Sequence, residues 1–552
     1  MKTIAHHLIL LLLCIACPTL ASAADRAYDD RRGRWLEIAE RLKPELREQT
    51  IRPRAVVRAI NDADAYQHWR YDSVGQPEDM LYSRNFKDVK EITLDFGKHL
   101  TGYFSFMPTT LTRCQDAPVR LRIYCGEMPA ELNTPLEPWS GSLSRAWMQD
   151  EVVTLMRMDS VITIPRRLAG RYLKIELLGA SPDFDFSIER PVFTAVTSAP
   201  DISPGLPEGT APAVADIHRV GLETLSECMQ TVYEDGPKRD RRLWAGDLYL
   251  ESLANRHSFR NFDLTKRCLY LFAALADDDG LIISNLFETP EPHPQYGSVC
   301  TSYSLLWNST LLEYLNDTGD IEAARELWPV ARRQVEEALT YVGPDGLYDR
   351  GLRPDSYAWT FFDWRDGLDT ATPMQGAIIF ALDQTYELAR RLGLEKEVAS
   401  WPTHADKMRK AALKNLYDPQ SGMFVSGPHR QISTLGQTWM VKSGVVKGAK
   451  ARKALKNVMS HPDALTPGTP YGMHYLLEAL VDSGLTDEAR TLMLDYWGGM
   501  VSKGADTFWE LYDPDNDFIS SYGFSPLNSA CHAWSCTPVY FIARYPEIFT
   551  PQ

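Results

Sequence analysis

The stretch from Glu234 to Asp247 has a composition suited to binding a polar, hydroxyl-rich ligand. It reads EDGPKRDRRLWAGD, in which acidic and basic residues alternate and one tryptophan stands among them. Carboxylates accept hydrogen bonds from hydroxyl groups, guanidinium groups orient them, and an indole packs on apolar C–H faces. Gly236 and Pro237 disfavour a regular helix here. A salt-bridged surface loop is the alternative interpretation, and the position of the stretch in the whole chain favours the binding site.

A pair of carboxyl groups facing each other across a cleft can hydrolyse a glycosidic bond. One donates a proton to the leaving oxygen, and the other activates water or attacks the sugar. The aspartates of the 234–247 stretch are candidates for one role, and Glu510, in the sequence GADTFWE, is a candidate for the other. Trp244 and Trp509 stand near these acids and could form apolar walls for a sugar ring. Such walls also raise the pKa of a neighbouring carboxyl group.

A series of helices must bring these distant residues together. Apolar residues at helical spacing predict twelve helices after residue 212. They are expected at residues 213–232, 248–257, 264–276, 301–316, 321–342, 373–392, 399–417, 433–443, 446–459, 471–483, 487–501 and 527–544. Connections after the odd-numbered helices are long and those after the even-numbered ones are mostly short, so all long loops fall at one end. This pattern predicts an (α/α)6 barrel of six helical hairpins.

Two further long loops of this barrel are rich in aromatic and acidic residues. The loop 343–372 contains YAWTFFDWRD, which includes Trp359, Asp363 and Trp364. The last long loop, 502–526, carries the GADTFWE sequence. Core packing at the end of the barrel would account for about half of these aromatic residues. The remainder are expected to line a ligand pocket.

The chain before the barrel has a different pattern. Short segments rich in Val, Ile, Phe and Tyr, separated by turns, predict an antiparallel β-sandwich over residues 87–197. Residues 24–86 are expected to be helical or irregular, and the Pro- and Gly-rich residues 198–212 form a linker. The catalytic barrel would then cover residues 213–552.

The composition disfavours nucleic acid as a partner and is compatible with neutral carbohydrate. The formal net charge is −15, which opposes binding to nucleic acids and anionic membranes. The 14 Trp and 25 Tyr residues exceed the needs of a core of this size. Calcium loops, zinc patterns, P-loops and dinucleotide fingerprints are absent from the sequence, so we expect neither a metal nor a cofactor.

Residues 1–23 have the pattern of a secretory signal peptide. An apolar core runs from Leu8 to Cys17 and is too short for a stable membrane span. Cleavage is expected after about Ala23. Acylation of Cys17, as in a lipoprotein, is disfavoured because the residues before it match the required small-residue box poorly. We therefore expect a secreted protein, in the periplasm. The seven cysteines that remain are odd in number and widely spaced, which is no disulfide framework.

The 235–247 motif resembles the signature of glycoside hydrolase family 78, the α-L-rhamnosidases, which is approximately D-C-P-x-R-E/D-x-R-x-x-W-x-G-D. GADTFWE resembles the second catalytic segment of that family, and NSACHAW, which contains His532, resembles its last-helix segment with a substrate-binding histidine. LDFGKHLTGY, residues 94–103, resembles a strand pair in the N-terminal β-domain of the family. The resemblance covers most of the chain.

This resemblance implies an inverting exo-hydrolase that removes terminal L-rhamnose on an (α/α)6 barrel. Asp240 falls at the position of the general acid and Glu510 at that of the general base. The resemblance also implies substrate-binding roles, for Asp235, Asp247, Trp359, Asp363, Trp364 and His532. From their residue types, Arg239, Trp244 and Trp509 are expected to bind substrate as well.

The motif also departs from the family pattern, and other functions stay open. Aspartate stands at position 240 where better-known members have glutamate, so Glu234 or Asp235 could deliver the proton instead. An exo-glycosidase of the same fold for another sugar is one alternative. A polysaccharide lyase with Tyr303, His293 or His532 as its base is another, and a non-catalytic lectin is a third.

Overall fold

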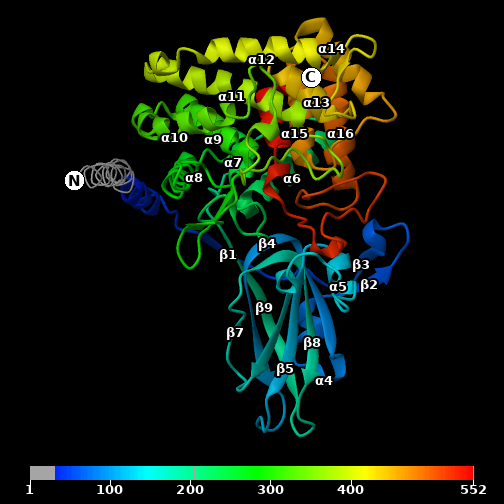
Figure 1. Ribbon diagram of the computed structural model, residues 1–552. Coiled ribbons are helices and arrows are strands. Elements are labelled where there is room, and N and C mark those ends of the chain that lie inside the picture. Colours follow the sequence, from blue (N-terminus) through cyan, green and yellow to red (C-terminus); the bar gives the residue numbers. More distant parts are fainter. Residues whose placement is uncertain (1–30, 203–204, 551–552) are drawn as a thin grey trace, which may run out of the picture.

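The computed structural model describes residues 31–202 and 205–550, which form an antiparallel sheet domain followed by a helical domain (Figure 1). The sheet lies below the helices in that view. The expected signal peptide, residues 1–23, lies outside the described residues. Within the two described ranges, the helices all fall short of the length and apolarity that crossing a bilayer requires.

The sheet domain is built around one long, bent strand. The sheet contains β1 (Arg47–Ile51), β9 (Phe186–Thr197), β4 (Glu91–Thr110), β8 (Leu168–Gly179), β5 (Val119–Gly126) and β6 (Gln149–Leu155) in this order, with β2 (Ala55–Asn61), β3 (Trp69–Gly75) and β7 (Ile162–Thr163) joined beside them. Strand β4 pairs with β2 and β8 in its first part and with β7 and β9 in its second. The sheet therefore curls around its own apolar core.

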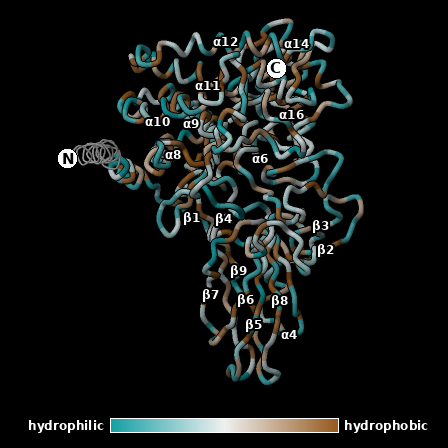
Figure 2. Tube along the Cα trace, viewed as in Figure 1, coloured by the Kyte–Doolittle hydropathy of each residue, from teal (hydrophilic) through white to brown (hydrophobic). Residues whose placement is uncertain are grey.

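Alternation of side chains fixes which face of the sheet is buried. In β5, Val119, Leu121 and Ile123 are fully buried and alternate with Arg120 and Arg122 on the other face. Figure 2 shows apolar and polar positions interleaved along the strands of this domain. The antiparallel sheet domain expected from the sequence is confirmed.

The prediction that residues 24–86 are helical or irregular is wrong for three segments of their described part. Residues 31–41 are helical, but β1, β2 and β3 follow and belong to the sheet. Strand β1, REQTI, is almost entirely exposed, and β3, WRYDSVG, is mixed in character. Strands with little burial carry no clear alternating apolar pattern. Besides their hydrogen bonds to neighbouring strands, β1 packs on the apolar core through Ile51 and β3 through Tyr71.

The helical domain agrees closely with the predicted helices. From α6 onward the main helices are α6 (Pro212–Cys228), α7 (Ala245–Arg256), α8 (Phe262–Ala274), α9 (Thr301–Thr318), α10 (Ile321–Leu339), α11 (Ala371–Leu392), α12 (Trp401–Asn415), α13 (Thr434–Lys442), α14 (Gly448–Met459), α15 (Pro470–Asp482), α16 (Thr486–Ser502) and α17 (Pro538–Arg544). The first eleven lie within a few residues of their expected positions. The long connections follow α6, α8, α10, α12, α14 and α16, as predicted.

These helices close into a ring of hairpins. Helices α7, α9, α11, α13 and α15 contact one another in sequence, and α17 contacts α7. Helix α15 meets α17 where the His474 and Phe541 rings lie 5.2 Å apart. The even-numbered helices lie outside them, and α6 packs against α16 and so joins the two ends of the chain. Each long loop therefore leads into the first turn of an inner helix at one end of the ring. The predicted (α/α)6 arrangement is confirmed.

The last predicted helix, at 527–544, is wrong in its first half. Helix α17 begins at Pro538, and the residues before it form an irregular segment with short 3-10 turns. The backbone N–H of His532 donates to Phe508 O at 2.9 Å, and that of Ala533 donates to Asp235 O at 2.7 Å. This segment therefore uses its hydrogen bonds to join the first and last long loops, and cannot also be helical.

Candidate active site

A cavity at the long-loop end of the barrel collects most of the residues singled out in the sequence. It is lined by Asp235, Arg239, Asp240, Trp244, Asp247, Tyr303, Trp359, Phe361, Trp364, Glu510, Tyr522, His532 and Trp534. Nine of the eleven predicted site residues are among them. Residues from the first and last hairpins meet here because the ring closes between α6 and α16.

Glu510 is buried and held by three hydrogen bonds. Its Oε2 atom accepts from the Arg239 guanidinium and, at 3.1 Å, from Ser529 N–H, while Oε1 accepts from the Tyr522 hydroxyl. Burial acts to raise the pKa of Glu510, but the charges of Arg239 and His532 and these hydrogen bonds outweigh it and lower the pKa. Glu510 is therefore an ionised carboxylate, which can accept a proton.

Asp240 lies on the other side of the same guanidinium. Arg239 Nη1 is 3.3 Å from Asp240 Oδ1, while Nη2 binds Glu510. Arg242 lies 3.6 Å from the other oxygen of Asp240. The Asp240 side chain is 14% exposed and the Glu510 side chain 2%. The two carboxyl groups thus share one compartment, and the Arg239 side chain separates them.

Arg239 is fixed from several directions. Its Nε atom donates to Leu527 O at 3.0 Å, and its guanidinium lies 4.2 Å from the centre of the Tyr522 ring. Its side chain is 2% exposed. A guanidinium held in this way has little freedom, so the carboxyl groups that it contacts keep a defined separation.

Asp235 organises the loop that carries Asp240. Its two oxygens accept hydrogen bonds from the backbone N–H groups of Asp240, at 3.0 Å, and Arg242, at 3.1 Å. Burial and the nearby Asp240 carboxyl raise the pKa of Asp235 to about 7. Glu234, the other neighbouring acid considered as a proton donor, pairs with Arg167 at 2.6 Å and does not line the cavity.

Asp247 and His532 form a second buried pair at the floor of the site. His532 Nε2 is 3.3 Å from Asp247 Oδ1, and both side chains are less than 5% exposed. Burial raises the pKa of Asp247. Burial acts to lower the pKa of His532, but Asp247 and Glu510 outweigh it and raise the pKa. Asp247 stands in the first turn of α7, where the helix dipole favours negative charge.

Aromatic rings make up much of the remaining wall. Phe361 stacks on Trp534 with ring centres 5.8 Å apart, and Tyr303 packs against both Trp244 and Phe361. Trp364 is 38% exposed and lies at the edge of the cavity. A cavity with carboxylates on one side and ring faces on another can bind both hydroxyl groups and C–H groups of a sugar.

Two of the predicted site residues lie outside the cavity. Trp509 stacks on Tyr66 of the sheet domain with ring centres 4.4 Å apart. Neighbouring residues of an extended segment point in opposite directions, so Glu510 faces the cavity and Trp509 faces away. Asp363 accepts hydrogen bonds from Gly468 N–H at 2.8 Å and from the backbone and hydroxyl of Thr469. The structure therefore does not support a sugar-binding role for Trp509 or Asp363.

Several cavity residues were not assigned to a sugar site from the sequence. Tyr522 stands in a loop of Ser, Gly and Asn residues without a recognisable motif, yet it contacts both Glu510 and Arg239. Tyr303 was named only as a possible base of a lyase, and Phe361 stood in the aromatic loop 343–372 without an assigned role. Trp534 lies two residues beyond His532, and that proximity was a usable signal.

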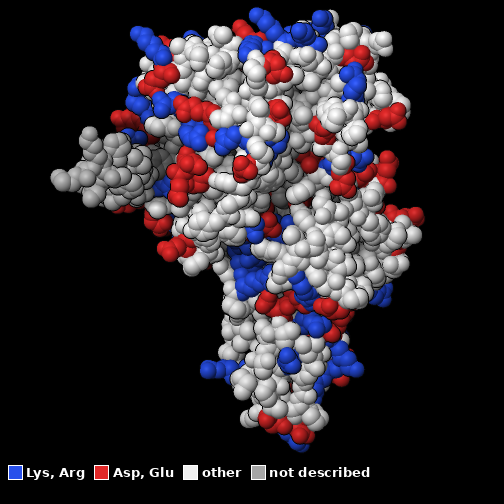
Figure 3. Space-filling model, in the orientation of Figure 1, with Lys and Arg blue, Asp and Glu red and all other residues white. Residues whose placement is uncertain are grey.

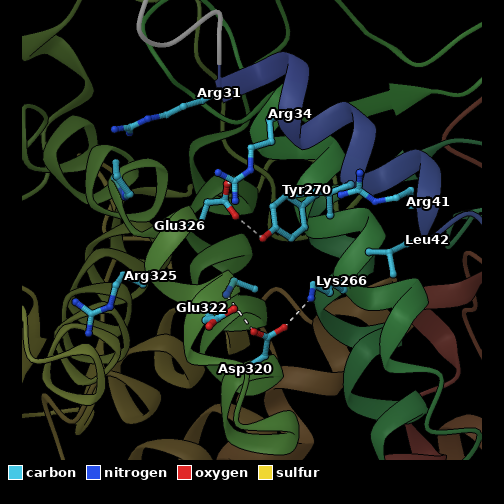
Figure 4. A pocket seen from close by; sticks show the side chains of 13 residues that line it. Arg31, Arg34, Arg41, Leu42, Lys266, Tyr270, Asp320, Glu322, Arg325 and Glu326 are labelled. Carbon is cyan, nitrogen blue, oxygen red and sulfur yellow. Dashed lines mark hydrogen bonds and ion pairs between the residues drawn. The ribbon is translucent and has the colours of Figure 1, made fainter.

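A larger cavity lies away from these residues, between the helix at residues 31–41 and helices α8 and α10 (Figure 4). Its volume is about 960 Å³. Two ion pairs stand in its lining, Arg34 with Glu326 at 3.3 Å and Lys266 with Asp320 at 2.7 Å. Tyr270 also donates to Glu326. None of the eleven predicted site residues lines this cavity, so it is not the candidate active site.

Comparison with known proteins agrees with this geometry. A family model described as the bacterial alpha-L-rhamnosidase 6 hairpin glycosidase domain matches residues 207–545, and the glycosyl hydrolase family 78 alpha-rhamnosidase N-terminal domain matches residues 53–195. The chain is 38% identical to a rhamnosidase from Klebsiella oxytoca solved with rhamnose bound, over 93% of this chain and 99% of that one, with a TM-score of 0.88.

More distant relatives share only parts of their length with this chain. The family 78 rhamnosidase of Bacillus sp. GL1 has the same fold at 21% identity and a TM-score of 0.69, over 82% of this chain and 46% of that one. The N,N'-diacetylchitobiose phosphorylase of Vibrio proteolyticus is 23% identical over 203 residues, which are 32% of this chain and 24% of that protein. The two matched domains and the high coverage of the Klebsiella structure settle the family. The chain is a glycoside hydrolase and belongs to glycoside hydrolase family 78.

Proposed function

We propose that this protein is an exo-acting α-L-rhamnosidase that hydrolyses the bond of a terminal L-rhamnose with inversion at the anomeric carbon. One observation carries the proposal: Asp240 and Glu510 contact the same Arg239 guanidinium in one cavity walled by aromatic rings. The similarity to a rhamnosidase with rhamnose bound supports this choice of sugar.

Glu510 acts as the general base in this mechanism. Its lowered pKa keeps it ionised, so it can remove a proton from a water molecule that attacks the anomeric carbon. Asp240 acts as the general acid and delivers a proton to the glycosidic oxygen. Inversion requires room for that water, with the two carboxyl groups about 6.5–9.5 Å apart. An intervening guanidinium that contacts both groups is compatible with such a separation.

The other side chains bind the sugar. Asp247 and His532 present a carboxylate and an imidazole that can hydrogen-bond to ring hydroxyl groups. The faces of Tyr303, Phe361 and Trp534 can contact the C–H groups and the C5 methyl group of a 6-deoxy sugar. Because the lining closes around the cavity from four segments of the chain, it accommodates a chain end, which is the reason for proposing exo action. The pattern of residues 1–23 supports secretion to the periplasm.

Asp235 is a second candidate for the general acid. It lines the cavity, and its pKa of about 7 would leave it partly protonated at neutral pH. Its oxygens are, however, occupied by two backbone N–H groups. Asp235→Asn and Asp240→Asn separate the two candidates on an aryl rhamnoside with a good leaving group. The variant that lacks the general acid should still hydrolyse the aryl rhamnoside, because a good leaving group departs without a proton. The same variant should not hydrolyse an alkyl rhamnoside, whose poor leaving group needs the proton.

The proposal is tested with a panel of p-nitrophenyl glycosides and with proton NMR of the first sugar released. We expect turnover of the α-L-rhamnoside in preference to other L- and D-sugars, and β-L-rhamnose as the first product. Release of a different sugar would identify an exo-glycosidase of other specificity. An ultraviolet-absorbing unsaturated product from a uronic-acid polymer would identify a lyase. Release of α-L-rhamnose first would contradict inversion.

A further inference from the structure

A buried group of charged residues crosses the junction between the two domains. The sheet domain contributes His99 from β4, Glu127 from the end of β5 and Glu131 from α5 (Pro129–Asn133). The helical domain contributes Glu227 from α6 and Lys238 from the catalytic motif. Every one of these five side chains is less than 10% exposed. Lys and Arg side chains, with acidic ones beside them, also gather on the outer surface where the domains meet (Figure 3).

Lys238 is the centre of this group. Its Nζ atom lies 2.8 Å from Glu127 Oε2 and 3.0 Å from Glu131 Oε1. It also donates to the carbonyl oxygens of Asn528, at 2.7 Å, and Pro526, at 3.4 Å. Two acidic side chains of the sheet domain thus hold a lysine that in turn holds the last long loop.

Glu127 makes a second connection to the same loop. Its Oε2 atom accepts a hydrogen bond from Ala530 N–H at 2.6 Å. Its Oε1 atom is 3.3 Å from His99 Nε2, and His99 Nδ1 is 3.3 Å from Glu227. The segment 526–530 is therefore attached to the sheet domain directly at Ala530 and, through Lys238, at Pro526 and Asn528.

The same segment supports the proposed catalytic groups. Arg239 donates to Leu527 O at 3.0 Å, and Ser529 N–H donates to Glu510 at 3.1 Å. Lys238 also directly precedes Arg239 and Asp240 in the chain. A shift of Lys238 or of segment 526–530 would therefore move Arg239 relative to Glu510.

The energetics are consistent with a positioning role. Burial acts to lower the pKa of Lys238, but Glu127 and Glu131 outweigh it and raise the pKa, so Lys238 is charged. Buried ion pairs are no more stabilising than well-packed apolar residues of similar volume, because desolvation offsets their attraction. Their hydrogen bonds do, however, fix direction and distance, as apolar contacts do not.

We propose that Glu127 and Glu131 are positioning residues for the reaction, which act through Lys238 to hold Arg239 and segment 526–530 in place. The sheet domain is then a structural part of the catalytic centre rather than an independent sugar-binding module. This inference rests on the proposed hydrolytic function of Asp240 and Glu510.

The test compares Glu127→Gln/Glu131→Gln with a matched variant, Glu478→Gln. Glu478 also pairs with a buried lysine, Lys442, but at the opposite end of the barrel from the cavity. For the double variant we expect kcat on the α-L-rhamnoside to fall about 10- to 100-fold with KM changed by less than about threefold, since small misplacements of catalytic groups act on kcat. Glu478→Gln is expected to lower the melting temperature and to leave kcat of the folded protein unchanged.

The single variant Glu131→Gln keeps the Glu127–Lys238 pair. It replaces the double variant in the kinetic test if the double variant does not fold. It is expected to lower kcat severalfold at unchanged KM. A wild-type kcat in either sheet-domain variant would overturn the proposal. So would an equal fall in kcat in Glu478→Gln, when its melting temperature equals that of the sheet-domain variant.

A crystal structure of the double variant separates this proposal from the proposed function. If the wild-type enzyme fails to hydrolyse rhamnosides, the function is wrong, but the positioning role is still read from the coordinates. Loss of the Lys238 contact to Asn528 and of the Arg239–Glu510 ion pair would support it. Retention of both contacts would overturn it.

Discussion

The six long loops of the barrel have different roles on the two sides of the ring. On the side where the ring closes, the loops after α6 and α16 supply the carboxyl groups, Arg239 and His532, and they rest on the sheet domain. On the opposite side, the loops after α12 and α14 supply no residue to the cavity lining. They brace their neighbours instead, as Thr469 does for Asp363. The chemistry is therefore concentrated at the seam between the first and last hairpins.

The charged residues of the site come from two loops that meet directly at the seam and from the first turn of α7, so the rest of this large ring need not supply any. At the seam, segments nearly 300 residues apart in the chain exchange hydrogen bonds directly, as in the bond from Ala533 N–H to Asp235 O. Seam variants should therefore change catalysis, and variants on the opposite side should change stability.

The largest effect is expected from the two carboxyl groups. Asp240→Asn and Glu510→Gln should each lower kcat on an alkyl α-L-rhamnoside by about 10²–10⁴-fold, because each removes one proton-transfer group. Steady-state kinetics of both variants, with circular dichroism as a check of folding, measures this. Retention of more than a tenth of wild-type kcat by either variant would exclude that residue from the assigned role.

Arg239 is expected to have the next largest effect. Arg239→Met should lower kcat by about 100-fold, because the positions of both carboxyl groups depend on it. Glu510 must be ionised to act, and the Arg239 charge lowers its pKa. Loss of that charge raises the pKa, so the acidic limb of the kcat/KM profile should move to higher pH.

Arg242→Met is the matched control for this shift. Arg242 lies 3.6 Å from Asp240, whereas the ion pair with Glu510 is made by Arg239. Its acidic limb should stay at the wild-type pH. An unshifted acidic limb in Arg239→Met would show that Glu510 is not the group titrating there.

A substitution of Asp363 tests whether the loops opposite the seam contribute to stability and not to catalysis. Asp363→Asn replaces a carboxylate that accepts hydrogen bonds from Gly468 and Thr469, in the loop before α15. We expect a loss of about 1–3 kcal/mol in the free energy of unfolding, measured by urea denaturation, with kcat within about twofold of wild type. Asp366→Asn, at an exposed position in the same loop, should leave both unchanged. A large loss of kcat without a loss of stability would indicate that Asp363 binds the sugar after all.

The smallest effect is expected from the two tryptophans. Trp364→Ala should raise KM about three- to tenfold, because an exposed ring at the edge of the cavity is lost from the substrate contact. Trp509→Phe should leave KM within about twofold, since its ring packs on Tyr66 outside the cavity. Equal effects of the two variants on KM would contradict the placement of Trp509.

Apolar spacing made the helical domain predictable. The inner helices are buried over most of their surfaces and the outer ones over one face, so apolar residues recur at helical spacing in both. The alternation of long and short loops predicted that these helices form a ring. Strands β1 and β3 were missed because their residues are exposed or mixed and have no period. The start of α17 was misplaced because the residues before Pro538 hydrogen-bond to distant loops, which no local pattern records.

The site was predictable by residue type and less so by side-chain direction. The acids and tryptophans of the 235–247 motif are unusual enough to identify the region. Whether Trp509 or Glu510 faces the cavity depends on the path of an irregular loop, and so does the orientation of Asp363. Tyr522 was missed because a tyrosine in a polar loop has no chemical signature until its contact with Glu510 is seen.

A crystal structure of Glu510→Gln with an intact alkyl α-L-rhamnoside would show whether Asp240 and residue 510 act on one glycosidic bond. We expect one rhamnose ring in the cavity, with an Asp240 oxygen within hydrogen-bonding distance of the glycosidic oxygen. We also expect the residue 510 side chain on the opposite side of the anomeric carbon, with a water molecule between. A sugar bound with either side chain out of reach of that bond would contradict the proposed roles of Asp240 and Glu510.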